Sequence, residues 1–192
     1  MNADGRRSIR LRRYDYRRPG AYFLTVCTCE RTLLFDNPQF AEVASTEWGR
    51  SALMREGIEL DALVVMPNHI HGIVFIVDSS VGAQGLAPFP ERRAQGLAPL
   101  QDQVFAHVVP RSLGSFVRGY KSAVTVQVNA LRGTPRLPVW QRNYYEHVVR
   151  DEADLERIRR YIDDNPRRWA FDRENPRGTP DRAEIEFWDT RR

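Results

Sequence analysis

The sequence is poor in the features that mark secreted or membrane proteins. Its 192 residues include only two cysteines, Cys27 and Cys29. Side chains two apart in a strand point to the same face, so we interpret these thiols as small buried groups in a reducing compartment and not as a disulfide. No apolar run approaches the roughly 18 residues of a membrane span, and no apolar segment follows the charged N-terminus as in a signal peptide. We therefore expect a cytoplasmic protein with no membrane partner.

Positively charged residues are in small excess. The chain has 29 Lys and Arg against 25 Asp and Glu, a net charge of +4 and a pI near 9.4. This excess is compatible with a nucleic-acid partner but does not require one. The first 18 residues hold seven arginines and two acids, Asp4 and Asp15. They form either a solvated tail or an arm that follows phosphates, and on the second interpretation Arg12 and Arg13 contact DNA.

Alternation, helical spacing and breaker residues predict an α+β fold. We expect a ferredoxin-like split β-α-β-β-α-β arrangement with one antiparallel sheet, helices on one face and an extra C-terminal helix. The spacing of apolar residues predicts strands over about 21–29, 60–66, 69–77 and 144–149, and helices over about 40–55, 113–131 and 151–163.

The same patterns divide the chain into a basic arm (1–18), one folded domain (19–170) and a polar C-terminal tail (171–192). Residues 78–103 are rich in Gly, Pro and Ala and contain one hexapeptide twice, at 83–88 and 94–99. We interpret 78–103 as a flexible insertion loop, with a flap that contacts DNA as the alternative.

The chemistry is concentrated at His69 and His71. Residues i and i+2 of a strand share a face, so both imidazoles project together while Ile70 points the other way. Two such imidazoles can share one metal ion. An isolated pair of this kind is more often structural, but here it lies in a turn and strand that are otherwise apolar.

A tyrosine in the long helix is the second candidate. Tyr120 lies on the apolar stripe expected to face the sheet, from which its hydroxyl is expected to reach the histidine face. Periodicity alone is equally consistent with a core aromatic residue.

Together these segments resemble the single-tyrosine HUH transposases of the insertion-sequence 200/605 type, and within them the REP-associated tyrosine transposases. The resemblance covers roughly residues 13 to 170. The matching motifs are Arg13-Tyr14 with Pro19-Gly20, Val64-Val65-Met66-Pro67-Asn68-His69-Ile70-His71-Gly72-Ile73-Val74, Gly119-Tyr120-Lys121-Ser122, Val139-Trp140-Gln141-Arg142-Asn143-Tyr144-Tyr145, and Ile162-Asp163-Asp164-Asn165-Pro166 with Trp169.

The resemblance implies a metal-dependent endonuclease and strand transferase for single-stranded DNA. It implies that Tyr120 attacks a phosphate, forms a 5′-phosphotyrosine and leaves a free 3′-hydroxyl. A phenol is a poor nucleophile at neutral pH and the phosphodiester is anionic, so a divalent ion, Mg²⁺ or Mn²⁺, is expected on the histidines. Hairpin or palindromic DNA is the expected partner, and the protein is expected to be a monomer or a homodimer.

The third metal ligand stays open. In related enzymes it can come from a polar residue one turn after the tyrosine, but that position is Val124, which cannot bind a metal. Thr125, Gln127 and Glu146 are weaker candidates, and we predict His147.

Further DNA contacts are predicted from cations and aromatic residues near Tyr120. Arg118 and Lys121 flank it, with solvated helix charges as the alternative. Trp140 and Arg142 belong to a segment that can stack on bases or, as an equal alternative, pack as a corner over the sheet.

Two other functions remain open on the sequence. A DNA-binding protein derived from such a transposase would keep the fold and the basic arm without needing Tyr120 or metal. A metal-dependent hydrolase of small molecules would use the two histidines but gain nothing from the arginine-rich arm.

Overall fold

The computed structural model describes residues 18–77 and 112–189, so Arg12, Arg13 and the insertion at 78–103 lie outside the described residues. Apart from the last helix, which was not predicted, its strands and α-helices agree with the predicted elements to within about two residues at most ends. They are β1 (Gly20–Cys27), α1 (Pro38–Leu53), β2 (Ile58–Met66), β3 (His69–Ile76), α2 (Leu113–Leu131), β4 (Tyr145–Val148), α3 (Glu152–Asp164) and α4 (Arg182–Asp189), with short 3-10 turns at Cys29–Arg31, Leu34–Asp36 and Asn165–Phe171.

One antiparallel sheet carries the fold, with strand order β2-β3-β1-β4. This strand order, with α1 connecting β1 to β2 and α2 connecting β3 to β4, confirms the predicted α+β class. The central strands β1 and β3 pair Thr25 with His71 and Cys27 with His69. The register therefore places the two histidines beside the end of β1, in the middle of the sheet.

Local capping signals fix where the helices start. The Asn37 side chain accepts a hydrogen bond from the Gln39 amide at the start of α1, and Pro38 occupies its first turn. Ser112 caps α2, and Asp151 caps α3 by accepting from the Asp154 amide. Within the described residues, no helix has the length and apolar character needed to cross a bilayer.

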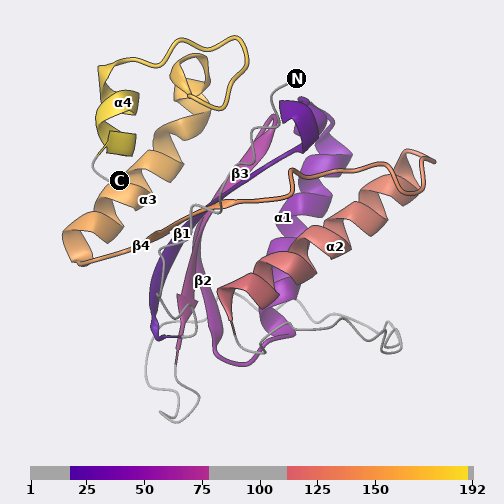
Figure 1. The fold of residues 1–192 in the computed structure, drawn as a ribbon, viewed down its shortest axis with the longest axis horizontal. Coiled ribbons are helices and arrows are strands. Elements are labelled where there is room, and N and C mark those ends of the chain that lie inside the picture. The colour runs from indigo at the N-terminus through magenta and orange to yellow at the C-terminus, as the bar shows by residue number, and fades with distance from the viewer. Residues whose placement is uncertain (1–17, 78–111, 190–192) are drawn as a thin grey trace, which may run out of the picture.

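The sheet is covered on both faces, which corrects the expectation of helices on one face only. Figure 1 shows α1 and α2 on one side of the sheet and α3 and α4 on the other. The first layer contains Tyr22, Leu24 and Ile70, and the second contains Phe23 and Ile73. Neighbouring residues of one strand thus enter opposite cores, as the pleat requires.

The segment after Phe171 is not a plain polar tail. It turns back over the sheet and ends in α4, whose Phe187 and Trp188 are each 8% exposed. A short amphipathic helix after a run of turns gives a weak periodic signal, because only three of its residues, Glu184, Phe187 and Trp188, are buried.

Candidate active site

Two imidazoles converge at the start of β3, as predicted. His69 and His71 are both fully buried, and their Nε2 atoms lie 2.9 Å apart. The Nδ1 atom of His69 lies 2.8 Å from Asn68 Oδ1, and that of His71 lies 2.9 Å from Thr25 Oγ1. Each ring is therefore held by Nδ1 with Nε2 turned to a common point, the arrangement that metal-binding histidines use.

Asp172 completes a group of three side chains that could hold a metal ion. One ligand atom from each of His69, His71 and Asp172 lies within 4.8 Å of the others, and Asp172 Oδ2 is 3.5 Å from His69 Nε2. Within the described chain, Asp172 Oδ2 and Asn165 Oδ1 are buried and accept no hydrogen bond. Buried oxygens are rarely left without a partner, so these two atoms fit a cation-binding role.

The donor set suits a divalent ion. Imidazole ligands at adjacent octahedral positions, each about 2.1 Å from one ion, have nitrogens about 3 Å apart, close to the observed separation. Burial and the charge of Arg31 lower the pKa of His69 to about 3, so its imidazole is neutral. Burial raises the pKa of Asp172 to about 6 despite a hydrogen bond from the Glu174 amide.

Tyr161 lies against this site. It projects from α3, and its ring centroid lies 5.3 Å from that of His71. Burial and the carboxylates of Glu184 and Asp172 raise the pKa of its hydroxyl above the usual value. A phenol and the imidazole pair therefore share one face of the sheet.

The C-terminal segment closes the site. The hydroxyl of Tyr161 donates to Glu184 Oε1 at 3.2 Å, and the Phe187 ring stacks on the Tyr161 ring at 3.5 Å. Trp188 donates to the same Glu184 oxygen and lies 6.2 Å from the His71 ring. In this conformation α4 occupies the space over the phenol.

The prediction that Tyr120 reaches the histidines is wrong. Tyr120 is fully buried between α1 and α2, where its hydroxyl donates to the Ala44 carbonyl at 3.1 Å and its ring packs against Trp48. It belongs to the same core as Ile70, on the face opposite His69 and His71. The alternation that brings the two histidines together also turns them away from α2.

Within residues 18–77 and 112–189, the side chains grouped so that they could hold a metal ion are His69, His71 and Asp172; His147 is not among them, contrary to the prediction. Its Nε2 lies 2.8 Å from Asp154 Oδ2, so the ring links β4 to the first turn of α3. Glu146 is also outside the group. Gln127, on α2, donates instead to Glu47 Oε1 at 2.6 Å.

The predicted DNA contacts near Tyr120 divide into buried and exposed residues. Trp140 is a core residue, donating to the Lys121 carbonyl and packing against Phe35. Lys121 Nζ donates to the carbonyls of Gln141 and Arg142, and burial lowers its pKa to about 8. Lys121 and Trp140 therefore hold α2 to the segment before β4, while Arg118 and Arg142 are exposed.

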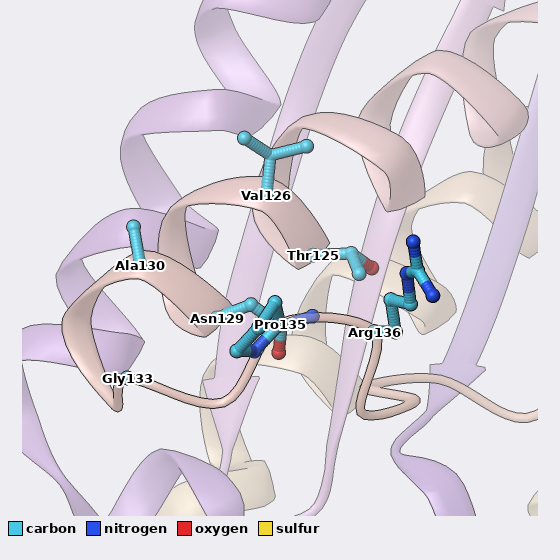
Figure 2. A pocket seen from close by; sticks show the side chains of 7 residues that line it. All are labelled: Thr125, Val126, Asn129, Ala130, Gly133, Pro135 and Arg136. Carbon is cyan, nitrogen blue, oxygen red and sulfur yellow. The ribbon is translucent and has the colours of Figure 1, made fainter.

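A surface pocket at the end of α2 is separate from this site. Figure 2 shows it between the last turns of α2 and the loop that follows. Its volume is about 540 Å³. Because α2 lies on the other face of the sheet, the pocket takes no part in the histidine site. Its lining residues are Thr125, Val126, Asn129, Ala130, Gly133, Pro135 and Arg136.

Sequence reasoning missed Tyr161, Asp172 and Glu184. A signal for Tyr161 was present, because it lies three residues after Ile158 and beside the apolar stripe of α3, directly before the motif that ends in Asn165-Pro166. Asp172 and Glu184 carry no such signal, since both follow irregular turns and reach the site only through the fold of the C-terminal segment.

Comparison with known proteins finds relatives in sequence and similar folds among solved structures. An uncharacterized Haemophilus influenzae protein is 34% identical over 178 residues, covering 87% of this chain and 91% of that protein. A second H. influenzae protein, provisionally described as a REP-associated tyrosine transposase, is 24% identical over 157 residues, covering 80% and 74%. No protein-family profile matches the chain.

A solved structure of a REP-associated tyrosine transposase bound to a REP hairpin superposes with a TM-score of 0.53. It is 22% identical and covers 82% of this chain and 72% of that one. The resemblance read from the sequence motifs is thereby confirmed. The chain belongs to one family with the uncharacterized H. influenzae protein, and its fold is that of the REP-associated tyrosine transposases.

Proposed function

We propose that this protein is a metal-dependent endonuclease and strand transferase for single-stranded DNA, a transposase whose nucleophile is Tyr161. One observation carries the proposal: Tyr161 packs on His71, above the face that holds His69, His71 and Asp172. Tyr120 cannot serve from the opposite face of the sheet.

His69, His71 and Asp172 would hold the divalent ion. Asn165 is a further candidate, because it follows Tyr161 by one helical turn and its buried Oδ1 accepts no hydrogen bond from the described residues. The bound ion would neutralise charge on the scissile phosphate. Two imidazoles with one carboxylate favour Mn²⁺ over Mg²⁺, since nitrogen ligands suit the softer ion.

The covalent step exchanges one phosphate ester for another. Tyr161 Oη bonds to phosphorus while the bond from phosphorus to the 3′-oxygen breaks. Tyr161 loses its hydroxyl proton, and the leaving 3′-oxygen takes up one proton to become a free 3′-hydroxyl. Because the ester is conserved as a 5′-phosphotyrosine, the strand can be rejoined to another 3′-hydroxyl without a nucleotide cofactor.

Hairpin DNA is the substrate we propose. The solved structure with this fold is bound to a REP hairpin, and the sequence motifs resemble those of proteins that act on palindromic repeats. The basic N-terminal segment of this chain would add sequence-independent affinity for the backbone.

The test is a covalent adduct between the protein and a single-stranded hairpin oligonucleotide in Mn²⁺. We expect an adduct that survives denaturation in the wild type and in Tyr120→Phe, and none in Tyr161→Phe. Tyr120→Phe should lower the free energy of unfolding by about 1 kcal/mol, because its buried hydrogen bond to Ala44 is lost. An adduct that persists in Tyr161→Phe and disappears in a folded Tyr120→Phe protein would contradict the assignment.

A second candidate is a non-catalytic DNA-binding protein. The complete burial of His69 and His71 beneath the C-terminal segment favours it, because a phosphate cannot reach them in this conformation. Hairpin binding without any adduct, in either metal, would support this candidate and reject the enzymatic one.

A further inference from the structure

One acidic side chain beside the metal-ligand group is held between two arginines. Glu174 Oε2 lies 2.8 Å from Arg31 Nη2, and Glu174 Oε1 lies 3.4 Å from Arg173 Nε. The Glu174 side chain is 10% exposed, whereas those of Arg31 and Arg173 are 43% and 47% exposed. The acid therefore lies inside, and both guanidinium groups reach solvent.

Hydrogen bonds connect this group to the histidines. The Glu174 amide donates to Asp172 Oδ1 at 2.6 Å, and the Glu174 carbonyl accepts from Asn68 Nδ2 at 2.7 Å. Asn68 Oδ1 in turn holds His69 Nδ1. Arg31 and Arg173 both contact Glu174, and the Glu174 amide donates to Asp172. The two arginines therefore lie at the edge of the histidine site.

The backbone that presents Arg31 is unusual. Glu30 and Arg31 both have left-handed φ angles, 54° and 55°, although neither is glycine. Such a conformation costs about 1–2 kcal/mol per residue, so neighbouring contacts must maintain it. The Thr28 hydroxyl lies within hydrogen-bond distance of the Thr32 and Asn68 carbonyls, and the Thr28 amide donates to the Asn68 carbonyl, which ties this turn to the residue before His69.

Arg173 is held by a different neighbour. Its guanidinium carbon lies 4.6 Å from the centroid of the Trp188 ring, so the cation rests on an aromatic face of α4. A phosphodiester resembles the Glu174 carboxylate in charge and in offering two oxygens to a guanidinium fork.

We propose that Arg31 and Arg173 form a phosphate-binding clamp for the DNA strand at this site, and that Glu174 occupies the clamp in the DNA-free protein. This inference rests on the proposed function for its ligand, a single-stranded DNA phosphate. It assigns binding roles to two residues outside the metal and nucleophile group, and it makes Glu174 a competitor of the DNA backbone.

The test measures binding without catalysis. The dissociation constant for a fluorescent hairpin oligonucleotide with a single-stranded flank is determined in EDTA at several salt concentrations. We expect Arg31→Gln and Arg173→Gln each to weaken binding about tenfold and to reduce the slope of log K against log salt by about 0.7. Glu174→Gln should tighten binding, since the clamp loses its internal anion.

Arg50→Gln is the matched control. Arg50 on α1 is 50% exposed and pairs with a buried acid, Glu47, at 3.1 Å, but on the opposite face of the sheet. Its substitution should leave the salt slope unchanged. Slopes for Arg31→Gln and Arg173→Gln equal to that of Arg50→Gln would overturn the proposal.

A further variant and the adduct assay distinguish a loss of DNA binding from a loss of folding or of catalysis. If Arg31→Gln does not fold, Arg31→Lys decides instead: the clamp predicts a retained slope with weaker binding, because the charge stays while the planar fork is lost. A wild type that forms no adduct but shows the expected slope changes would reject the enzymatic function and keep the clamp. An adduct together with unchanged salt slopes would support the enzymatic function and reject the clamp.

Discussion

Asn68 joins three parts of the site through one amide group. Its Oδ1 faces His69 Nδ1, and its Nδ2 contacts the carbonyls of Glu174 and Arg31. An amide oxygen accepts only, so His69 must carry its proton on Nδ1 and present Nε2 as a lone pair. The residue before the first histidine thereby sets its tautomer and anchors the C-terminal segment beside it.

Gly72 shows how tightly the opposite face of β3 is packed. A Cβ at this position would lie 2.4 Å from Trp48 Cζ2, so the indole ring fills the place of a side chain. We predict that Gly72→Ala lowers the free energy of unfolding by about 1–3 kcal/mol through overpacking. Urea denaturation measures the change.

Gly49→Ala is the control, because no heavy atom lies within 4 Å of its added Cβ in α1. It should raise stability by about 0.5–1 kcal/mol through helix propensity. A Gly72→Ala protein as stable as Gly49→Ala would show that the Trp48 contact is not close in solution.

At the scale of elements, α3 is the helix whose position matters, since it carries Tyr161. Its first turn is tied to β4 through His147 and Asp154. Burial opposes ionisation of Asp154, but hydrogen bonds from Arg157, His147 and the Arg150 amide outweigh it and lower the pKa to about 2.

The pH dependence of stability follows from that lowered pKa. A carboxyl group with a folded pKa near 2, against an ordinary value of 3.8, stabilises the fold above about pH 4 and loses this contribution as the pH falls toward 2. We expect Asp154→Asn to cost about 2 kcal/mol at pH 7 and progressively less below pH 4.

Urea unfolding at pH 7, 4 and 3 tests this expectation, with Asp163→Asn, an exposed position on the same helix, as the control. A difference between Asp154→Asn and wild type that stays constant from pH 7 to pH 3 would show that the carboxylate is not stabilised in the fold.

In the proposed reaction, the C-terminal helix α4 must move before DNA can reach Tyr161. Its buried face is small, with Glu184, Phe187 and Trp188. We predict that a chain ending at Asp181 exposes the histidines, so that diethylpyrocarbonate modifies His69 and His71 about tenfold faster or more, as local opening becomes cheaper. Peptide mass spectrometry reads the rates.

Phe187→Ala is the milder variant if the shortened chain does not fold, and it removes only the ring stacked on Tyr161. Ile185→Ala, on the exposed side of α4, is its control. Equal histidine reactivity in wild type and Phe187→Ala would mean that α4 does not limit access.

For the whole molecule, metal binding should appear as added stability. An ion that binds only the folded state raises the free energy of unfolding by about 2.7 kcal/mol at a concentration one hundred times its Kd, or about 5–10 °C in Tm for a chain of this size. We expect this shift in Mn²⁺, a smaller one in Mg²⁺, and none in His69→Ala or Asp172→Asn.

Differential scanning calorimetry with and without EDTA measures the shift. His147→Ala is the control, because His147 pairs with Asp154 away from the ligand group. The assigned ligands would be rejected if the Mn²⁺ shift in Tm persisted in His69→Ala. They would also be rejected if the shift were lost in His147→Ala but kept in Asp172→Asn.

The sequence by itself determined the α+β class, most helix and strand positions and the histidine pair. These depend on local rules, because caps, helical spacing and the two-residue period of a strand act within a few residues. The sequence motifs also carried the resemblance to REP-associated tyrosine transposases.

Only the tertiary structure decided which partners the histidines have. Tyr120 and Tyr161 both lie beside apolar stripes on helices that pack against the sheet, and a stripe does not say which face it covers. The order of strands and helices along the chain packs α2 on the face of the sheet that carries Ile70, and α3 on the opposite face, which carries His71. Asp172 and Glu184 reach the site through turns with no periodic signal, because their positions depend on packing between segments about a hundred residues apart.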